Sequence, residues 1–511
     1  MRTRNLQKLK LTSACALVLM LAGCSFFKGK GNERVEGHHH LYSQPQAPSI
    51  EELPDHQRRI VLVATNDWQG NLEPKSEVAR DQHHPQQILM SVGGVDIFAR
   101  YLNILRALYP NQVVTVDAGN SLGGTLAART SGAQAVLSAF QELKYDAIGF
   151  SSKDLAAGPS LKKGTTSAAK WIPPLLEKAV TPVVLTNLID LHTAKPVEWG
   201  PTTPHTMKEV NGVQVGFIGL LGHEKLDSAL MNGLYIEPSM QALLKQSRAL
   251  RLKGAEVIVL LAYGGIQCGL DRAEKNNLPL SKVNFDPTDG SVCNTNSELA
   301  TFIQALPSGM VDVIVTGGGT SKIANVINGI PVVQAFSGGV AFSRVDLIFD
   351  RLNKRVLTTE TKIYQPTRLC HRFFKATEDC YTEDKSIDHR HLIPATYLGE
   401  EVMPDEKMTE WHLPWRKQVT QEEAKLVKVQ VLHTKMAQNL RESLGTDAAV
   451  TGTDMGSHTQ TTSMMAQRDL WRVQGGIDQI RLLLIPGQSL AALREYLDSD
   501  DGFSWSQRLG W

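Results

Sequence analysis

The sequence predicts an α/β fold, in a layered α+β arrangement where buried strands alternate with helices. Three observations support this prediction. Short apolar runs rich in β-branched residues recur along the chain, several end in polar or glycine-containing turns, and stretches with helical periodicity lie between them. In such folds, sites form just past the carboxyl ends of the strands. The residues that close each run are therefore the candidates for chemistry.

The strand-like runs can be followed in chain order. Residues 60–64 are apolar and end in Thr-Asn-Asp, and residues 113–116 end in Asp-Ala-Gly-Asn. The remaining runs cover residues 182–185, 213–220, 257–261, 311–316 and 330–334. Apolar residues at helical spacing predict helices over residues 95–108 and 240–253.

At 511 residues, the chain is long enough for several domains. Residues 59–350 hold the strand-like runs and form the expected main domain. Residues 24–58 are polar and predict a flexible tether, and residues 351–425 are richer in charge and predict a connector. Residues 426–511 predict a smaller α+β domain.

The N-terminus has the layout of a secretory signal, which we assign to residues 1–23. A basic stretch precedes an apolar run over residues 11–21 that is too short to span a bilayer. The next residues, Leu-Ala-Gly-Cys, resemble the lipobox of bacterial lipoproteins. This resemblance implies that Cys24 becomes the lipidated N-terminus and anchors the protein to a membrane. Ser25 after it favours the outer membrane of the cell envelope.

Composition and cysteine content indicate which partners and which cellular compartment to expect. The formal net charge is +1, and no segment combines clustered basic residues with stacking aromatics, so we expect no nucleic-acid partner. Four cysteines remain after the lipobox, and an exported compartment permits disulfides. Four cysteines allow three pairings, of which sequence proximity favours Cys268–Cys293 and Cys370–Cys380.

Several strand-end segments, taken together, resemble the 5′-nucleotidase and cyclic-nucleotide phosphodiesterase metallophosphatases. They follow the family order and spacing between residues 60 and 350. The matching segments are 65–74 (TNDWQGNLEP), 93–106 (two glycines, then Arg100 and Arg106), 117–125 (DAGNSLGGT), 145–150 (YDAIGF), 211–219, 311–317 and 329–334. This resemblance implies a metallophosphatase-like β-sandwich flanked by helices.

The family reaction uses two divalent metals such as Mn²⁺ or Zn²⁺, held by carboxylates and imidazoles at the strand ends. By resemblance, Asp67 is the only metal-ligand position that keeps its family residue. Where the family has ligand histidines, this chain holds Gln69, Tyr263 (or Ala262), Gly318 and Thr320. Asn120 stands at the position of the bridging carboxylate, Ser152 at that of a ligand asparagine, and Lys153 at that of the histidine that would stabilise the transition state. Asp117 and Asp154 lie nearby in sequence but match no ligand position, so we expect turn or helix-capping roles for them.

The C-terminal segment shows the same loss of family features. Residues 447–456 and 484–490 resemble parts of the family's C-terminal domain, but the arginine expected after the glycines is missing. The later family segment with the base-stacking aromatics has no counterpart, so we expect a truncated 5′-nucleotidase C-terminal-like domain.

These substitutions predict a pseudoenzyme with no catalytic residues, no bound metal and no cofactor. Its expected partners are a membrane, through the lipid, and an envelope protein or glycan. Two alternatives stay open. An active phosphohydrolase with a remodelled metal site would need residues such as His223, Asp117 or Asp154 to converge, and a nucleotide-binding protein would bind without catalysis.

Overall fold

The computed structural model describes residues 52–78, 89–157, 167–222, 226, 228–266, 297–318, 322–381, 391–423, 426–428 and 464–466. The signal peptide, Cys24 and most of the predicted tether lie outside these residues. So does nearly all of the predicted C-terminal domain, apart from the paired strands β25 (Leu426–Lys428) and β26 (Met464–Ala466).

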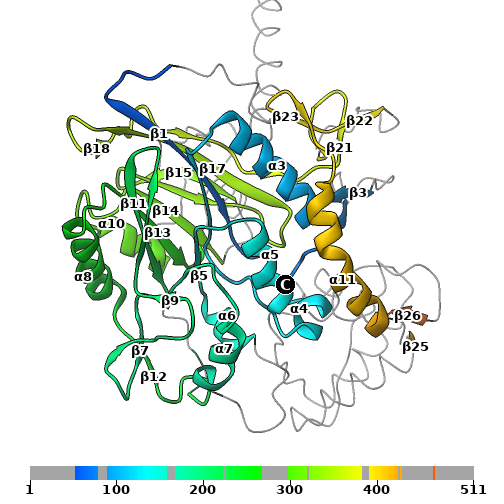
Figure 1. Cartoon of the computed structure of the whole chain (residues 1–511), viewed down its shortest axis with the longest axis horizontal. Helices are drawn as coiled ribbons and strands as arrows, with labels where there is room; N and C mark the ends of the chain where they lie inside the picture. The colour runs from blue at the N-terminus through cyan, green and yellow to red at the C-terminus, as the bar shows by residue number, and fades with distance from the viewer. Residues whose placement is uncertain are drawn as a thin grey trace, which may run out of the picture.

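Two β-sheets face each other at the centre of the molecule (Figure 1). The first sheet contains β1 (Gln57–Thr65), β4 (Val113–Asp117), β5 (Ala147–Gly149), β6 (Val183–Val184), β9 (Thr202–Thr203), β17 (Ala341–Asp350), β18 (Arg355–Val356), β19 (Lys362–Ile363) and β20 (Thr367–Arg368). The second contains β10 (Thr206–Val210), β11 (Val213–Leu220), β13 (Val257–Tyr263), β14 (Val313–Gly317), β15 (Ile323–Ile327) and β16 (Ile330–Gln334).

The space between the two sheets is filled by one apolar cluster, to which both sheets contribute buried side chains such as Leu62, Val116, Val259 and Val315. Helices cover the outer faces. On the side of the first sheet lie α3 (Val95–Leu108), α4 (Leu126–Thr130), α5 (Gln134–Glu142), α6 (Ser152–Ala156), α7 (Ala168–Leu176) and α11 (Glu406–Glu423). On the side of the second lie α8 (Ser239–Leu252) and α10 (Glu298–Gln304).

This architecture confirms the predicted layered α/β fold. Strands at the middle of each sheet are parallel, as in β1–β4 and β13–β14, and are buried on both faces, which is why their sequences are continuous apolar runs. The helix predicted over residues 95–108 is α3, and the one predicted over 240–253 is α8. Within the described ranges, no helix combines the length and apolar character needed to cross a membrane.

The predicted connector contributes to the main fold. Strands β18, β19 and β20 all pair with β17, so this segment extends the first sheet. Helix α11 lies beside α3 and α4. Smaller ribbons complete the fold: β2 (Lys75–Val78) with β3 (Leu89–Val92), β7 (Leu188–Asp190) with β8 (Lys195–Pro196) and β12 (Leu234–Ile236), β21 (Arg372–Phe374) with β22 (Leu392–Pro394), and β23 (Thr396–Tyr397) with β24 (Glu400–Glu401).

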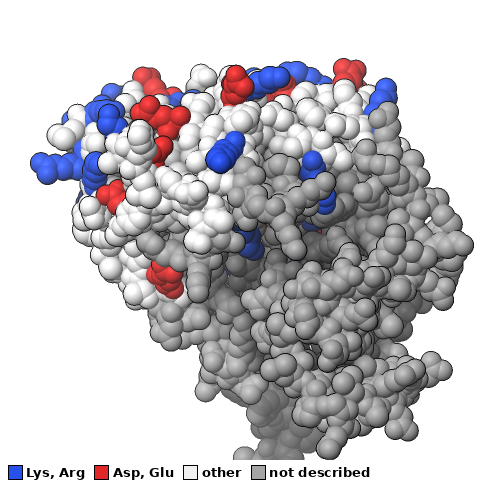
Figure 2. Space-filling model, turned by 90° about the horizontal axis from the view of Figure 1, so that it is seen from below, with Lys and Arg blue, Asp and Glu red and all other residues white. Residues whose placement is uncertain are grey.

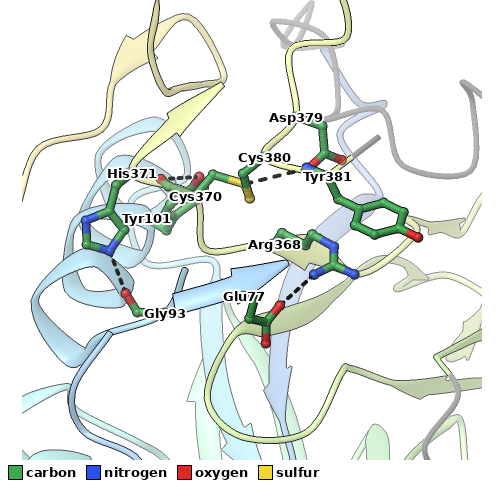
Figure 3. Close-up of a disulfide and its surroundings, with 9 residues drawn as sticks. All are labelled: Glu77, Gly93, Tyr101, Arg368, Cys370, His371, Asp379, Cys380 and Tyr381. Atoms are coloured by element: carbon green, nitrogen blue, oxygen red, sulfur yellow. Dashed lines mark hydrogen bonds and ion pairs between the residues drawn. A yellow bond between two sulfur atoms is a disulfide. The ribbon is translucent and has the colours of Figure 1, made fainter. Parts of the chain in front are cut away.

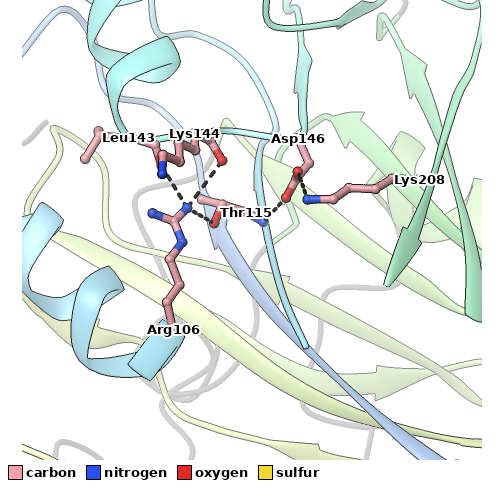
Figure 4. Close-up of polar contacts among 6 residues, drawn as sticks. All are labelled: Arg106, Thr115, Leu143, Lys144, Asp146 and Lys208. Carbon is pink, nitrogen blue, oxygen red and sulfur yellow. Dashed lines mark hydrogen bonds and ion pairs between the residues drawn. The ribbon is translucent and has the colours of Figure 1, made fainter. Parts of the chain in front are cut away.

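Polar contacts tie the first sheet to α3 and to the second sheet (Figure 4). One guanidinium nitrogen of Arg106, on α3, donates to the carbonyl oxygen of Leu143 at 2.8 Å and to the hydroxyl of Thr115 at 3.2 Å. The carboxylate of Asp146 accepts from the backbone N–H of Thr115 at 2.9 Å and from Lys208 Nζ, on β10, at 2.6 Å. These contacts connect β4 to α3 and, through Asp146, to β10.

Candidate functional site

The strands β1 and β4 are parallel neighbours in the first sheet, and β13 and β14 are parallel neighbours in the second, so each pair ends at one edge of its own sheet. The two sheets pack face to face, and the loops after all four strands meet at this edge. The loop after β1 is bonded along its length to the loop after β4. The backbone N–H groups of Asp67, Gln69 and Gly70 donate to the carbonyl oxygens of Gly119, Asn120 and Ser121 at 2.9, 3.0 and 2.9 Å. Asp67, Gln69 and Asn120 all have positive φ angles of 50–59°, a left-handed conformation that is uncommon outside glycine.

Asp67 is the centre of a buried hydrogen-bonded group that we call the Asp67 cluster, made of Asn66, Asp67, Asn120, Tyr263 and Gly318. Its Oδ1 accepts from Asn120 Nδ2 at 2.5 Å and from the Tyr263 hydroxyl at 2.8 Å. Its Oδ2 accepts from the backbone N–H of Gly318 at 2.8 Å and from Asn66 Nδ2 at 2.9 Å. The side chain of Asn120 also donates to the Tyr263 hydroxyl at 3.0 Å.

The Asp67 cluster supplies the hydrogen bonds that the carboxylate of Asp67 needs, because this residue is only 2% exposed to solvent. Four donors from four different residues share its two oxygens, so protein groups alone compensate the cost of its burial. A carboxylate that binds a metal must instead turn a lone pair toward the ion, and neighbouring ligands must do the same. Here the neighbours of Asp67 present N–H and O–H groups to it.

Tyr263 fills the space that a ligand at position 318 would need. A Cβ atom added to Gly318 would lie 3.0 Å from Cε1 and 3.1 Å from Cζ of the Tyr263 ring, and the φ angle of Gly318 is +95°. A histidine at this position would therefore press against the ring, which would have to shift, and would strain the backbone. The residues present consequently do not fit the pair of divalent metals that the family reaction requires.

The other predicted site residues lie around this cluster or outside the described residues. Gln69 is half-buried, in the loop after β1, and Ser152 is buried in α6. Lys153 is exposed on α6, and its ammonium group makes no hydrogen bond or ion pair with the Asp67 cluster. Thr320 and His223 lie outside the described residues.

Asp154 has a structural role, as predicted. With Ser151 it forms a capping box at the start of α6, in which each residue's side chain accepts from the other's backbone N–H. Its two oxygens also accept from the backbone N–H groups of Asn120, Ser121 and Leu122 at 2.5, 2.8 and 2.9 Å. The carboxylate therefore holds the loop after β4 in place, although burial raises its pKa.

Asp117 also has the predicted turn role. Its Oδ1 accepts from the backbone N–H of Gly119 at 2.9 Å and from the hydroxyl of Ser121 at 2.7 Å, while Oδ2 is 2.7 Å from the Thr65 hydroxyl. Complete burial raises the pKa of Asp117 to about 8, although these hydrogen bonds favour the ionised form. The carboxyl groups of Asp117 and Asp154 therefore hold strand-end loops together, and their oxygens already accept hydrogen bonds from protein groups.

Sequence inspection missed one member of the cluster. Asn66 lies inside the Thr-Asn-Asp segment, and its side chain bridges Asp67 to the loop after β16. Its Oδ1 accepts from the backbone N–H of Ala335 at 2.7 Å, and its Nδ2 donates to the carbonyl of the same residue at 3.2 Å. Its place beside Asp67 in the motif was a signal for this role.

The disulfide Cys370–Cys380 is present, as predicted (Figure 3). It joins the segments on either side of β21, and both cysteines are buried. Asp379 also lies close to these sulfur atoms, but the thiols are consumed in the disulfide and are not metal ligands in this state. The predicted pair Cys268–Cys293 lies outside the described residues.

No protein-family model matches this chain. Among curated proteins, it is similar to the cell wall protein Lmo0130 of Listeria monocytogenes, with 23% identity over 313 residues. This match covers 56% of the chain but only 36% of the relative, so the chain spans about a third of that protein's length.

The chain is also similar to solved structures. A proposed 5′-nucleotidase from Staphylococcus aureus has a TM-score of 0.51 at 15% identity, covering 81% of this chain and 72% of that one. A 5′-nucleotidase precursor from Thermus thermophilus has a TM-score of 0.48 at 18% identity, covering 72% and 61%. The calcineurin-like phosphoesterase YfkN from Bacillus subtilis has a TM-score of 0.47 at 17% identity, covering 71% and 98%. The likeness to the Staphylococcus aureus structure shows that the chain has the fold of the 5′-nucleotidase-type metallophosphatases.

Proposed function

We propose that this protein is a non-catalytic member of the 5′-nucleotidase-like metallophosphatases, which uses the fold as a binding or structural module of the cell envelope. The observation that carries the proposal is the hydrogen bonding of Asp67. Its two oxygens are shared among Asn66, Asn120, Tyr263 and the backbone of Gly318, where the family reaction would need metal ions.

Electrostatics supports the same conclusion. Two divalent cations about 4 Å apart repel strongly, and a bridging carboxylate normally offsets that repulsion. The bridging position holds the neutral Asn120, whose amide nitrogen points to Asp67. Asp117 and Asp154 are bound to strand-end loops, so neither is available to replace the missing anions.

The proposed location is extracytoplasmic, with a lipid on Cys24 that anchors the chain to the outer membrane. Two features support it: the lipobox-like segment at residues 21–24 and the similarity to a protein named for the cell wall. An envelope protein or a glycan is the partner class that this location favours.

A turnover assay tests the proposal. Purified full-length chain is supplied with Mn²⁺ or Zn²⁺ and with AMP or a cyclic nucleotide, beside the matched variant Asp67→Asn prepared in the same way. We expect both preparations to convert AMP to adenosine and phosphate, or the cyclic nucleotide to its nucleoside monophosphate, at the same background rate. Chelator-sensitive turnover that the wild type shows and Asp67→Asn lacks would reject the proposal and favour an active phosphohydrolase with a remodelled site.

A further inference from the structure

A groove on the outer side of the second sheet lies apart from the Asp67 cluster. We call it the α8 groove; it is formed by the first turns of α8 and by residues 307–310, and its volume is about 810 Å³. Helices α8 and α10 both pack against the second sheet. The buried face of α8, including Leu243 and Leu250, packs toward the second sheet, so the groove belongs to the opposite, solvent-facing side.

The floor of the α8 groove is apolar. Met240, Leu244, Pro307 and Met310 line it, and the side chain of Leu244 is 47% exposed. One hydrogen bond joins its two sides: the Ser247 hydroxyl donates to the carbonyl of Met310 at 2.7 Å. Covering an apolar surface of this kind with a partner lowers the free energy of the complex, because water is released from both surfaces.

The charge of the α8 groove has one sign. Lys245 and Arg248 lie on its wall three residues apart, so they are neighbours on one face of the helix. None of the residues that line the groove is acidic, and α8 itself contains no Asp or Glu. Within the described part of the chain, neither cation pairs with a carboxylate, whereas Arg251 on the next turn is bound to Asp312 at 2.7 Å.

The surface is not basic throughout. On the face drawn in Figure 2, acidic and basic side chains alternate along the rim. Two cations beside an apolar floor, with no acid between them, complement a ligand that presents apolar and anionic groups at similar spacing. A polypeptide segment can carry apolar side chains and carboxylates at this spacing along one chain, so we take a polypeptide as the occupant, and an anionic lipid surface is the alternative outcome of the test.

We propose that the α8 groove docks an acidic segment of a partner protein, with an apolar side chain seated over Leu244 and carboxylates paired with Lys245 and Arg248. This inference goes beyond the proposed loss of catalysis and does not depend on it. A partner bound in the α8 groove would not contact the strand-end loops, so docking would not depend on the Asp67 cluster.

The test measures binding of a short fluorescent peptide rich in Glu and Leu to the purified full-length chain. We expect saturable, salt-sensitive binding that weakens about tenfold or more in the double variant Lys245→Glu/Arg248→Glu. The matched control is Lys170→Glu/Lys178→Glu, which makes the same charge change at exposed positions in and after α7. Its affinity should stay within about twofold of the wild type.

A second variant separates docking from charge alone. Leu244→Ser changes an exposed side chain, so the fold should survive, and we expect weaker peptide binding with an unchanged salt dependence. The proposal is overturned if the peptide does not saturate, if both double variants weaken it equally, or if Leu244→Ser has no effect. Binding of anionic phosphatidylglycerol vesicles through Lys245 and Arg248, without peptide binding, would equally overturn it in favour of a lipid surface.

Discussion

Replacement of Asp154 by alanine should lower the free energy of unfolding by about 3–5 kcal/mol. The carboxylate accepts from the backbone N–H groups of Ser151, Asn120, Ser121 and Leu122, and all of these atoms are buried. Alanine would leave these donors without an acceptor in a region that excludes water, and each unsatisfied group carries a desolvation penalty. Urea denaturation of the purified protein measures the change.

Asp190→Ala is the matched control for this experiment. Asp190 also accepts from backbone N–H groups, those of His192 and Thr193, but in an exposed loop. Because water can replace the carboxylate there, we expect a loss of about 1 kcal/mol or less. Equal losses in the two variants would contradict the structural role that we assign to Asp154.

The ion pair between Arg344 and Asp346 should produce the other large effect. Both residues lie on β17, their side chains are 1% and 5% exposed, and the guanidinium is 2.6 Å from the carboxylate. Removing one partner leaves the other charge buried and uncompensated, so Asp346→Ala should cost about 3–5 kcal/mol. The guanidinium also lies over the rings of Tyr109 and Tyr364, which prevents it from turning toward water.

An exposed ion pair provides the control. Arg100 and Glu400 are 3.6 Å apart, and their side chains are 32% and 60% exposed. Water already solvates both charges, so Glu400→Ala should change the free energy of unfolding by about 1 kcal/mol or less. A loss for Asp346→Ala no larger than this control would show that Arg344 finds other compensation in the fold.

Much of the fold could be predicted from the sequence because its local signals agree with its global arrangement. Strands buried on both faces need continuous apolar runs, and those runs gave the positions of β1, β4, β11, β13 and β16. The boundaries of α3 follow from apolar periodicity after Gly93-Gly94. Gly93 is required there because its φ is +85° and a Cβ atom would lie 2.7 Å from the carbonyl oxygen of Gly339.

The site was predictable in part only. Comparison with the family motifs pointed to the positions that differ from the family ligands, but not to the hydrogen bonds that those residues make. That outcome depends on side chains from β13 and from the loops after β1 and β4 meeting across the sheet edge, and no local pattern encodes this contact. The hydroxyl of Tyr263 reaches Asp67 although the two residues are 196 positions apart in sequence.

The same geometry explains why simple restoration of the ligands should fail. Asn120→Asp would place a second carboxylate beside Asp67, but the Tyr263 ring would still occupy the space next to Gly318. Any recovery of a metal site therefore requires replacement of Tyr263 together with the lost histidine and carboxylate positions.

The most direct test of the central claim is the metal content of the wild-type protein. The purified full-length chain is incubated with excess Mn²⁺ or Zn²⁺, passed through a desalting column and measured by elemental analysis, with Asp67→Asn as the matched control. Because the donors around Asp67 already use both of its oxygens, we predict no stoichiometric pair of metals and no difference between wild type and variant. Two equivalents of metal per wild-type chain, lost in Asp67→Asn, would contradict the claim that this fold no longer holds a catalytic metal centre.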